Sequence, residues 1–350
     1  HLRLMMDFDR VARSPYFRSY WIQRNAADLR QFRASISDVE RAPGQIRENR
    51  ILLRREPAAD RSAEEPATGQ LVRLVPAGAG LYRAWAHPDV NQALALIRHK
   101  LLTPGSDTQT ASLEAPVVVL GNGVAGSEED LETRIDEAPL ADDKGVAEIA
   151  GLRGLLASRK LEALLEAGGG YAQGGDVFVG SNALIALLAD RDWDGAGAQA
   201  ALTQAAANVW TTSQLGADWT PRTVSGQEYF ELNGLARLAV AASGRILLMS
   251  DSPELLAAAL GRLGAPAGQP AVYEAAYRHS REFTFYERLT RLIDAPGRPA
   301  AGSGGGAQPQ FFSDNVASLG RTLQRVQAVS LVAHDNGAAL RQSVVYRLLQ

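Results

Sequence analysis

Residues 221–256 read PRTVSGQEYFELNGLARLAVAASGRILLMSDSPELL, and they carry the clearest structural signals in the chain. The pairs Ser225-Gly226, Asn233-Gly234 and Ser243-Gly244 divide it into four short runs. Asn-Gly is the strongest hairpin signal in a sequence because both residues tolerate a positive φ. A helix from Pro253 to Leu263 follows, since proline already has the φ of a first helical turn. The stretch therefore predicts an antiparallel meander closed by a helix.

The flanking sequence repeats this alternation of strands and helices. Val177 to Leu188 is an apolar strand that precedes a long alanine-rich helix, and Val329–Ala333 with Leu340–Leu348 predicts a final hairpin. Upstream, Leu71–Val75 and Leu81–Ala86 flank a glycine-rich turn and predict another hairpin. Ala157, Leu161, Leu164 and Leu165 then predict a helix that ends at the glycines 168–170. We therefore expect an α+β protein with antiparallel sheets, or β-meanders, whose helices pack on one face.

Two strand-to-helix junctions are similar to each other. Residues 84–89 (AWAHPD) and 249–254 (MSDSPE) both end a strand, place Pro at the first helical position and follow it with an acid. The similarity has two explanations, a duplicated unit or independent use of a good helix start. We divide the chain into an N-terminal helical arm and linker (1–66), a first α+β unit (67–170) and a second, related unit with a C-terminal helix and hairpin (171–350).

The arm is rich in arginine, with 13 arginines against 8 acidic residues between His1 and Arg61. Met5, Phe8 and Val11 recur at helical spacing, which predicts a helix. Aromatic and basic residues interleave along it, as they do at protein interfaces. An ordinary amphipathic helix with solvated arginines is the alternative. The residues expected to face a partner are Arg10, Arg18, Trp21 and Arg24.

Composition excludes several classes of protein. The 350 residues are 46% hydrophobic and 21% charged, as in globular proteins, and contain no Cys. Disulfides, zinc ribbons and thiol nucleophiles are therefore excluded. A net charge of −3 argues against a nucleic-acid-binding protein. The chain has no apolar run long enough for a transmembrane helix, and because it begins at His1 we expect a removed upstream anchor near a membrane.

A glycine motif invites comparison with dinucleotide-binding folds. Residues 117–126 (VVVLGNGVAG) match G-x-G-x-x-G after an apolar strand. The acid expected about 20 residues later has no strand before it, and the acidic run at 127–130 would repel a pyrophosphate. We interpret the motif as a turn and expect no cofactor.

Asp190, Asp192, Asp194 and Gly195 match the first half of a calcium-binding loop. Ala201 stands where the bidentate Glu of such a loop belongs. The alternative is that Asp194 caps the following helix. Both interpretations stay open, and no metal ligand is assigned.

No catalytic residue is predicted. The five histidines are scattered, and neither H-E-x-x-H nor G-x-S-x-G occurs. A hydrolase would need a site assembled from distant residues, and we expect the protein not to be an enzyme.

Part of the chain resembles exported bacterial cell-envelope proteins of unknown function. The resemblance covers about half of the chain, in Phe178–Leu188, Tyr229–Leu232, Leu238–Asp251, Ser252–Leu256 and Phe311–Asn315. It implies a periplasmic location, or one on the outer face of a membrane, and implies no activity.

Three functions follow in order of preference. The first is a non-enzymatic envelope protein, a structural or assembly subunit that contacts other envelope proteins through its surfaces. The second is an extracytoplasmic module that binds a small ligand or calcium, and the third is a hydrolase. An apolar patch would favour the first, a bound ion the second and a deep polar pocket the third.

Overall fold

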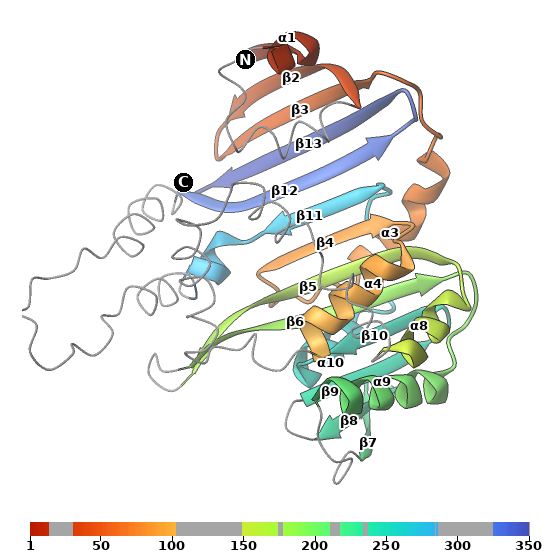
Figure 1. The fold of residues 1–350 in the computed structure, drawn as a ribbon. Helices are drawn as coiled ribbons and strands as arrows, with labels where there is room; N and C mark the ends of the chain where they lie inside the picture. The colour runs from red at the N-terminus through yellow and green to blue at the C-terminus, as the bar shows by residue number, and fades with distance from the viewer. Residues whose placement is uncertain are drawn as a thin grey trace, which may run out of the picture.

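The computed structural model describes residues 1–13, 31–102, 149–173, 178–210, 218–233, 237–283, 285 and 325–349. Its strands form one antiparallel sheet of 13 strands (Figure 1). In sheet order they are β1 (Leu2–Asp7), β2 (Phe32–Ala42), β3 (Gln45–Arg54), β13 (Ala339–Leu348), β12 (Val326–Asp335), β11 (Tyr273–Tyr277), β4 (Leu81–Ala86), β5 (Leu161–Gln173), β6 (Phe178–Ala189), β10 (Ile246–Ser250), β9 (Arg237–Ser243), β8 (Gln227–Asn233) and β7 (Trp219–Val224).

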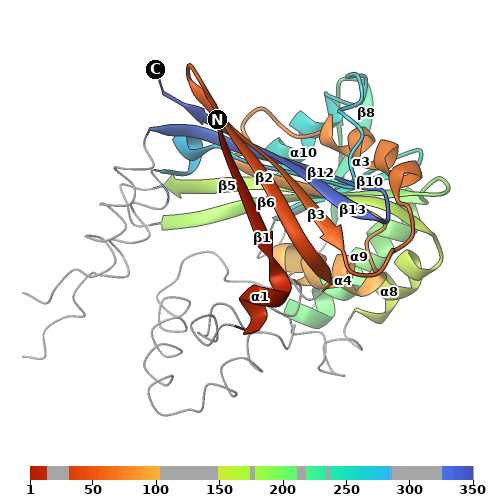
Figure 2. The ribbon, with the colours of Figure 1, turned by 90° about the horizontal axis from the view of Figure 1, so that it is seen from above.

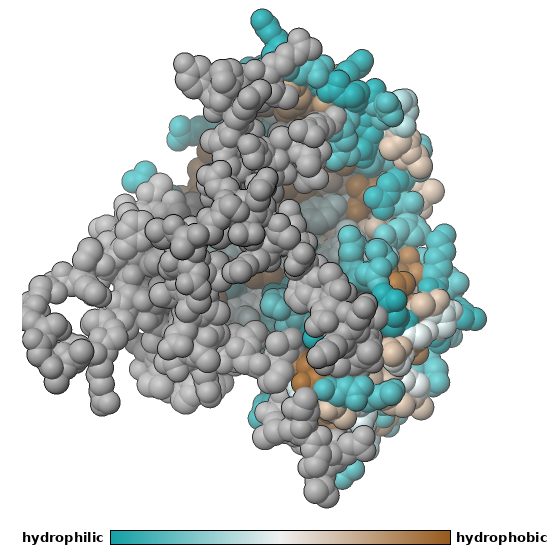
Figure 3. All heavy atoms as spheres, viewed as in Figure 1, coloured by the Kyte–Doolittle hydropathy of each residue, from teal (hydrophilic) through white to brown (hydrophobic). Residues whose placement is uncertain are grey.

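Helices cover this sheet on both faces. They are α1 (Phe8–Arg13), η2 (Ser62–Glu64), α3 (Glu65–Val72), α4 (Val90–Ile97), η3 (Arg98–Leu102), α8 (Ala150–Ala157), α9 (Gly195–Trp210) and α10 (Pro253–Leu260). Viewed from above, α1, α4, α8 and α9 lie on one side of the sheet, and α3 and α10 lie on the other (Figure 2). We call these the α4 face and the α10 face. In the space-filling view, hydrophilic residues interleave with hydrophobic ones along the right side of the molecule (Figure 3).

The core has two layers because the central strands are apolar on both faces. Leu164 of β5 and Ile185 of β6 pack against α4, α8 and α9, while their neighbours Leu165 and Leu184 pack against α3 and α10. All four side chains are fully buried. Successive strand residues point to opposite faces, so burial on both faces produces a continuous apolar run. The α+β class and the antiparallel sheet are confirmed, whereas the expectation that helices cover one face is wrong for these strands.

The N-terminal arm is not the predicted helix. Leu2–Asp7 forms a strand paired with Val39–Ala34 of β2, and α1 supplies only the six residues that follow. The spacing of Met5 and Phe8 misled because it crosses the end of a strand. The missed signal was Pro43-Gly44, where Gly44 adopts φ +69° and joins β2 to β3.

Two other elements differ from the prediction. Leu71–Val75 does not pair with β4 but lies at the end of α3, which begins with Pro66 in its first turn. Leu161–Leu165, expected in a helix, belongs to β5, because leucines at three-residue spacing also fit a strand that is buried on both faces.

The clearest sequence predictions are confirmed. The apolar strand is β6, the alanine-rich helix is α9, the meander comprises β7 to β10, and the last hairpin joins β12 to β13. Gly226 and Gly244 adopt positive φ in their turns, and Gly234 lies outside the described residues.

The two similar junctions supply the N-caps of two different helices. Asp89 caps α4 and accepts a hydrogen bond from Asn91 N, so Pro88 precedes the helix and is not its first residue. Ser252 caps α10, with Pro253 in the first turn. The two helices then lie on opposite faces of the sheet. One sheet runs through all three predicted parts of the chain.

Candidate functional site

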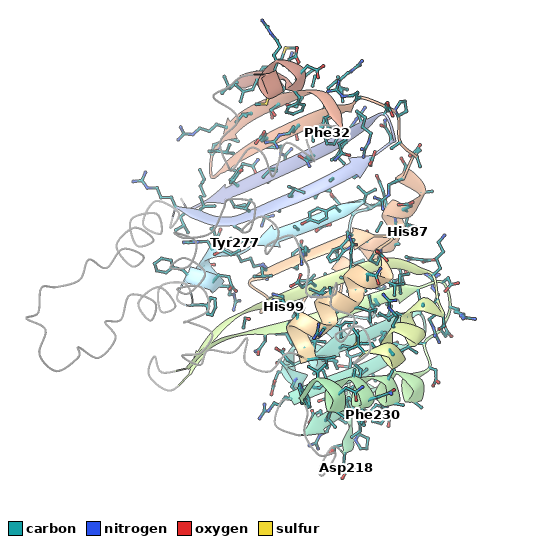
Figure 4. All side chains as sticks on the ribbon, in the orientation of Figure 1. Phe32, His87, His99, Asp218, Phe230 and Tyr277 are labelled. Atoms are coloured by element: carbon teal, nitrogen blue, oxygen red, sulfur yellow. The ribbon has the colours of Figure 1, made fainter. Side chains whose placement is uncertain are left out.

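A groove of about 1020 Å³ lies on the α4 face, near the middle of the sheet. We call it the α4 groove. Its walls are α4 with η3 on one side and the end of β3 with the connection to η2 on the other. Figure 4 shows His99 beside the end of α4 and Phe32 on β2, towards the β1 end of the same sheet. The floor is formed by β4, β11, β12 and β13.

The floor is largely apolar. Trp85 of β4 lies opposite Tyr273 of β11, which lies opposite Ala333 of β12. Ala333 in turn lies opposite Gln342 of β13, so one row of side chains crosses four strands. Three strand spacings correspond to about 14 Å. Leu331 and Leu340 complete this apolar surface.

The α4 helix separates the groove from the core. Gln92, Ala95 and His99 recur at helical spacing along the groove. Ala93 and Ile97, on another side of the same helix, are buried against the sheet. The helix continues into the π-helical turn η3, whose Arg98, His99 and Lys100 all line the groove.

Positive charge exceeds negative charge along the lining. Among the described lining residues, Asp335 is the single carboxylate, and the five cations are Arg54, Arg61, Arg83, Arg98 and Lys100. A concave surface with this imbalance attracts anions.

At one end of the groove, Arg54 is held by Asp335. Its Nη2 donates to Asp335 Oδ2 at 2.5 Å, and its guanidinium carbon lies 5.3 Å from the centre of the Phe32 ring. Asp335 Oδ1 also accepts the backbone N–H of Gly337. Both charged side chains are largely buried, and their opposite charges neutralise each other. The pair also holds the end of β3 against the end of β12.

The other end carries two cations on one buried carboxylate. Glu166 is buried, and its Oε2 accepts from Arg83 Nε at 2.5 Å while its Oε1 lies 3.4 Å from Lys100 Nζ. The Arg83 guanidinium also lies 5.2 Å from the centre of the Trp85 ring. Arg83 and Lys100 stay 49% and 36% exposed, so their charges face the groove with one carboxylate between them.

Tyr273 places a hydroxyl in this floor. Burial raises the pKa of Tyr273, against the attraction of the Arg83 charge for its ionised form. The hydroxyl therefore stays protonated at neutral pH and can both donate and accept a hydrogen bond. Arg61, another residue of the lining, donates to Glu64 Oε2 at 2.6 Å and to the carbonyl of Ala86.

The residues predicted for a partner interface are only partly placed. Arg10 is exposed on α1, and its backbone N–H donates to Asp7 Oδ1. Arg18, Trp21 and Arg24 lie outside the described residues, as does the glycine motif at 117–126. The interface therefore stays a prediction.

Two aspartates of the calcium-like loop, Asp190 and Asp194, have structural roles. Asp194 Oδ1 accepts from Ala196 N and caps α9, which confirms the capping alternative. Asp190 Oδ1 accepts from Lys160 N. Within the described ranges no three His, Asp or Glu side chains are grouped to hold a metal ion.

The α4 groove was not predicted from the sequence. The available signal was the alternation of Arg83 and Trp85 in β4, which places a cation and an aromatic ring on one face. Glu166 and Lys100, which complete this end of the groove, are distant in sequence from β4. Only the fold therefore brings them together with Arg83 and Trp85.

The comparisons with known proteins leave the family open. No family model matches the chain, and no curated protein matches it. One solved structure, crystal form IV of TP0453, aligns with 77% of this chain and 91% of its own, at 11% identity and a TM-score of 0.29. That score is too low to support an argument about fold or function.

In the part of the chain that the structure describes, no helix has the length and apolar character needed to cross a membrane. The periplasmic location and the envelope partners stay predictions.

Proposed function

We propose that the protein is a non-enzymatic binding protein whose α4 groove takes an amphiphile with an anionic head group and an apolar body. The observation that carries this proposal is the pairing of an apolar floor with a cationic end. Of the three functions expected from the sequence, this is the small-ligand module.

The head group belongs at Arg83 and Lys100. Among the described residues, these two cations share the one carboxylate of Glu166, which leaves one positive charge in excess there. Arg54 is less suitable because Asp335 already pairs with it and both side chains are largely buried. A phosphate or carboxylate oxygen accepts charge-assisted hydrogen bonds from both cations.

The apolar body belongs along the row from Trp85 to Ala333. Contact with this row removes the aliphatic chain of the ligand from water, and that is the main source of binding energy for an apolar chain. Tyr273 lies between Trp85 and Ala333 in this row, and its hydroxyl can hydrogen-bond to the ligand. With Gln342 of β13 included, the row is about 14 Å long, which is comparable to an extended dodecyl chain.

The test compares dodecyl phosphate, dodecyl maltoside and dodecyltrimethylammonium below the concentrations at which they form micelles, by calorimetry. We expect dodecyl phosphate to bind about ten-fold more tightly than the other two, and its affinity to fall as salt rises. Lys100→Gln should weaken it about five-fold. Lys160→Gln, at an exposed lysine away from the groove, is the matched control.

Equal affinity for the three detergents would show that charge does not select the ligand. Equal losses in Lys100→Gln and Lys160→Gln would show that the effect is one of net charge and not of the groove. Either result would reject the proposal.

A further inference from the structure

The two edges of the sheet differ in how they are protected. On β7, Pro221 has no N–H to offer a further strand, and Arg222 places a charge beside it. On β1, all six residues are exposed and none is proline. The large apolar side chains on this edge are Leu2, Leu4, Met5 and Met6, at 55%, 52%, 77% and 45% exposure.

An edge strand of this kind is a template for another strand. Within the described residues β1 pairs with β2 alone, so alternate N–H and C=O groups of Leu2–Asp7 point away from the sheet. Proteins usually protect such edges by charge, proline or a bulge. Here the outward edge combines unpaired backbone with apolar side chains.

The sequence of β1 is complementary to itself. In an antiparallel pair centred on Met5, Arg3 lies opposite Asp7 of the second copy, and Leu4 lies opposite Met6. Opposite charges then meet at both ends, and apolar side chains meet between them. A register shifted by two residues places Arg3 opposite Met5 and loses both ion pairs.

We propose that β1 is a self-association edge, at which two copies of this chain pair antiparallel about Met5 and join their sheets. The two-fold axis stands perpendicular to the sheet, because Leu4 and Met6 lie on one face and must meet their counterparts on that face. The charged side chains are already oriented by local contacts. Arg3 is fixed by Asp38 at 2.6 Å, and Asp7 Oδ1 caps α1.

This inference rests on the edge of the sheet and goes beyond the proposed ligand binding. Since no lining residue of the α4 groove belongs to β1, the two proposals succeed or fail independently.

The first test exchanges the charges. Arg3→Glu and Asp7→Arg each place like charges opposite one another in a pair of identical copies, so each should raise the dissociation constant about ten-fold in sedimentation velocity. An equimolar mixture of the two variants pairs Glu with Arg at one end and Asp with Arg at the other. It should therefore return to within about three-fold of the wild-type constant.

Local damage to α1 or to the contact between Arg3 and Asp38 would persist in the mixture. Recovery of the dissociation constant in the mixture therefore shows that position 3 of one copy lies opposite position 7 of the other. Arg222→Glu on β7 is the control and should leave association unchanged. A wild-type chain that stays monomeric up to about 100 μM, or a mixture no better than its components, would overturn the proposal.

The second test reports the register. The chain has no cysteine, so a Met5→Cys variant carries a single thiol at the two-fold axis. Directly opposite residues have Cα atoms about 4.5 to 5.5 Å apart, within reach of a disulfide. We expect mild oxidation to cross-link Met5→Cys and to leave Val224→Cys, on β7, monomeric.

Another occupant would give a different result. Binding to phosphatidylglycerol vesicles that Leu4→Lys abolishes, without self-association or cross-linking, would assign the edge to a membrane surface and reject the dimer.

Discussion

Two regions of the one sheet are stabilised in different ways. In sheet order, the first runs from β4 through β5, β6 and β10 to β9, and the second runs from β1 through β2, β3 and β13 to β12. In the first region, helices bury both faces, and side chains such as Leu164 and Leu184 are inaccessible to solvent. In the second region, the described core is the small cluster of Phe8, Phe32 and Leu52. We call these the covered region and the polar region.

Ion pairs and the backbone ladder take a larger share in the polar region. Arg3 pairs with Asp38 across β1 and β2, and Arg54 pairs with Asp335 across the sheet. Hydrophobic burial is proportional to area, so it stabilises the covered region strongly, whereas exposed ion pairs contribute little each. The α4 groove lies at the boundary, where apolar floor and charged rim meet. One continuous sheet therefore combines a region stabilised by burial on both faces with a region in which ion pairs and backbone hydrogen bonds take a larger share.

The largest expected effect tests the covered region. Leu164→Ala should lower the free energy of unfolding by about 3 to 4 kcal/mol, because it leaves a cavity between the sheet and the helices. Leu331→Ala, on the partly exposed floor of the groove, makes the same change and should cost about 1 kcal/mol. Urea denaturation measures both. Equal losses would show that the two regions are packed alike.

A smaller effect tests the buried pair of the polar region. Arg54→Met removes the cation and leaves Asp335 buried without it, which should cost about 2 to 3 kcal/mol. The control is Arg222→Met, which breaks a half-exposed pair with Glu231 and should cost measurably less. If both substitutions cost the same in urea denaturation, burial does not distinguish these pairs.

The smallest effects distinguish the regions by pH. Burial raises the pKa of Glu282, which accepts from Gly170 N in the covered region. The hydrogen bond of Arg3 lowers the pKa of Asp38 in the polar region. A raised carboxyl pKa favours folding below its ordinary value of 4.5, and this contribution is lost as pH rises through the folded pKa. A lowered carboxyl pKa favours folding at pH values above its ordinary value of 3.8, and this contribution is lost as the pH falls through the folded pKa.

Two substitutions should therefore have opposite pH dependence. Glu282→Gln gains stability relative to wild type as pH rises from 4 to 8, whereas Asp38→Asn is destabilised at neutral pH by an amount that shrinks below pH 4. Thermal unfolding across this range checks both. Parallel curves for the two variants would contradict the assignment of burial to Glu282 and of an ion pair to Asp38.

Local chemistry explains which elements were predictable. The meander and the last hairpin follow from Gly226, Gly244 and Gly337, whose positive φ is costly for residues with a side chain. The cap of α9 follows from Asp194, and that of α10 from Ser252. Each signal involves neighbours in sequence, so no knowledge of the rest of the fold was needed.

The elements that were missed lack a clear local pattern. The alternation of β2 and β3 is weak, and their one local signal is the turn at Pro43-Gly44, while their position in the sheet depends on pairing β3 with β13, at the other end of the chain. The sequence of β5 also fits a helix, because an apolar run is compatible with either structure. Its assignment as a strand depends on the helices that bury both of its faces.

The sequence by itself determined the α+β class, the antiparallel meander and the absence of thiol chemistry, because turn residues, periodicity and composition act locally. The remaining features depend on contacts between distant parts of the chain. Glu166 meets Arg83 and Lys100 because β5 pairs with β4 and α4 packs over both, and β1 becomes an edge because no further strand follows it in the described sheet. Contacts between distant residues depend on how the whole sheet is ordered, and no local pattern encodes that order.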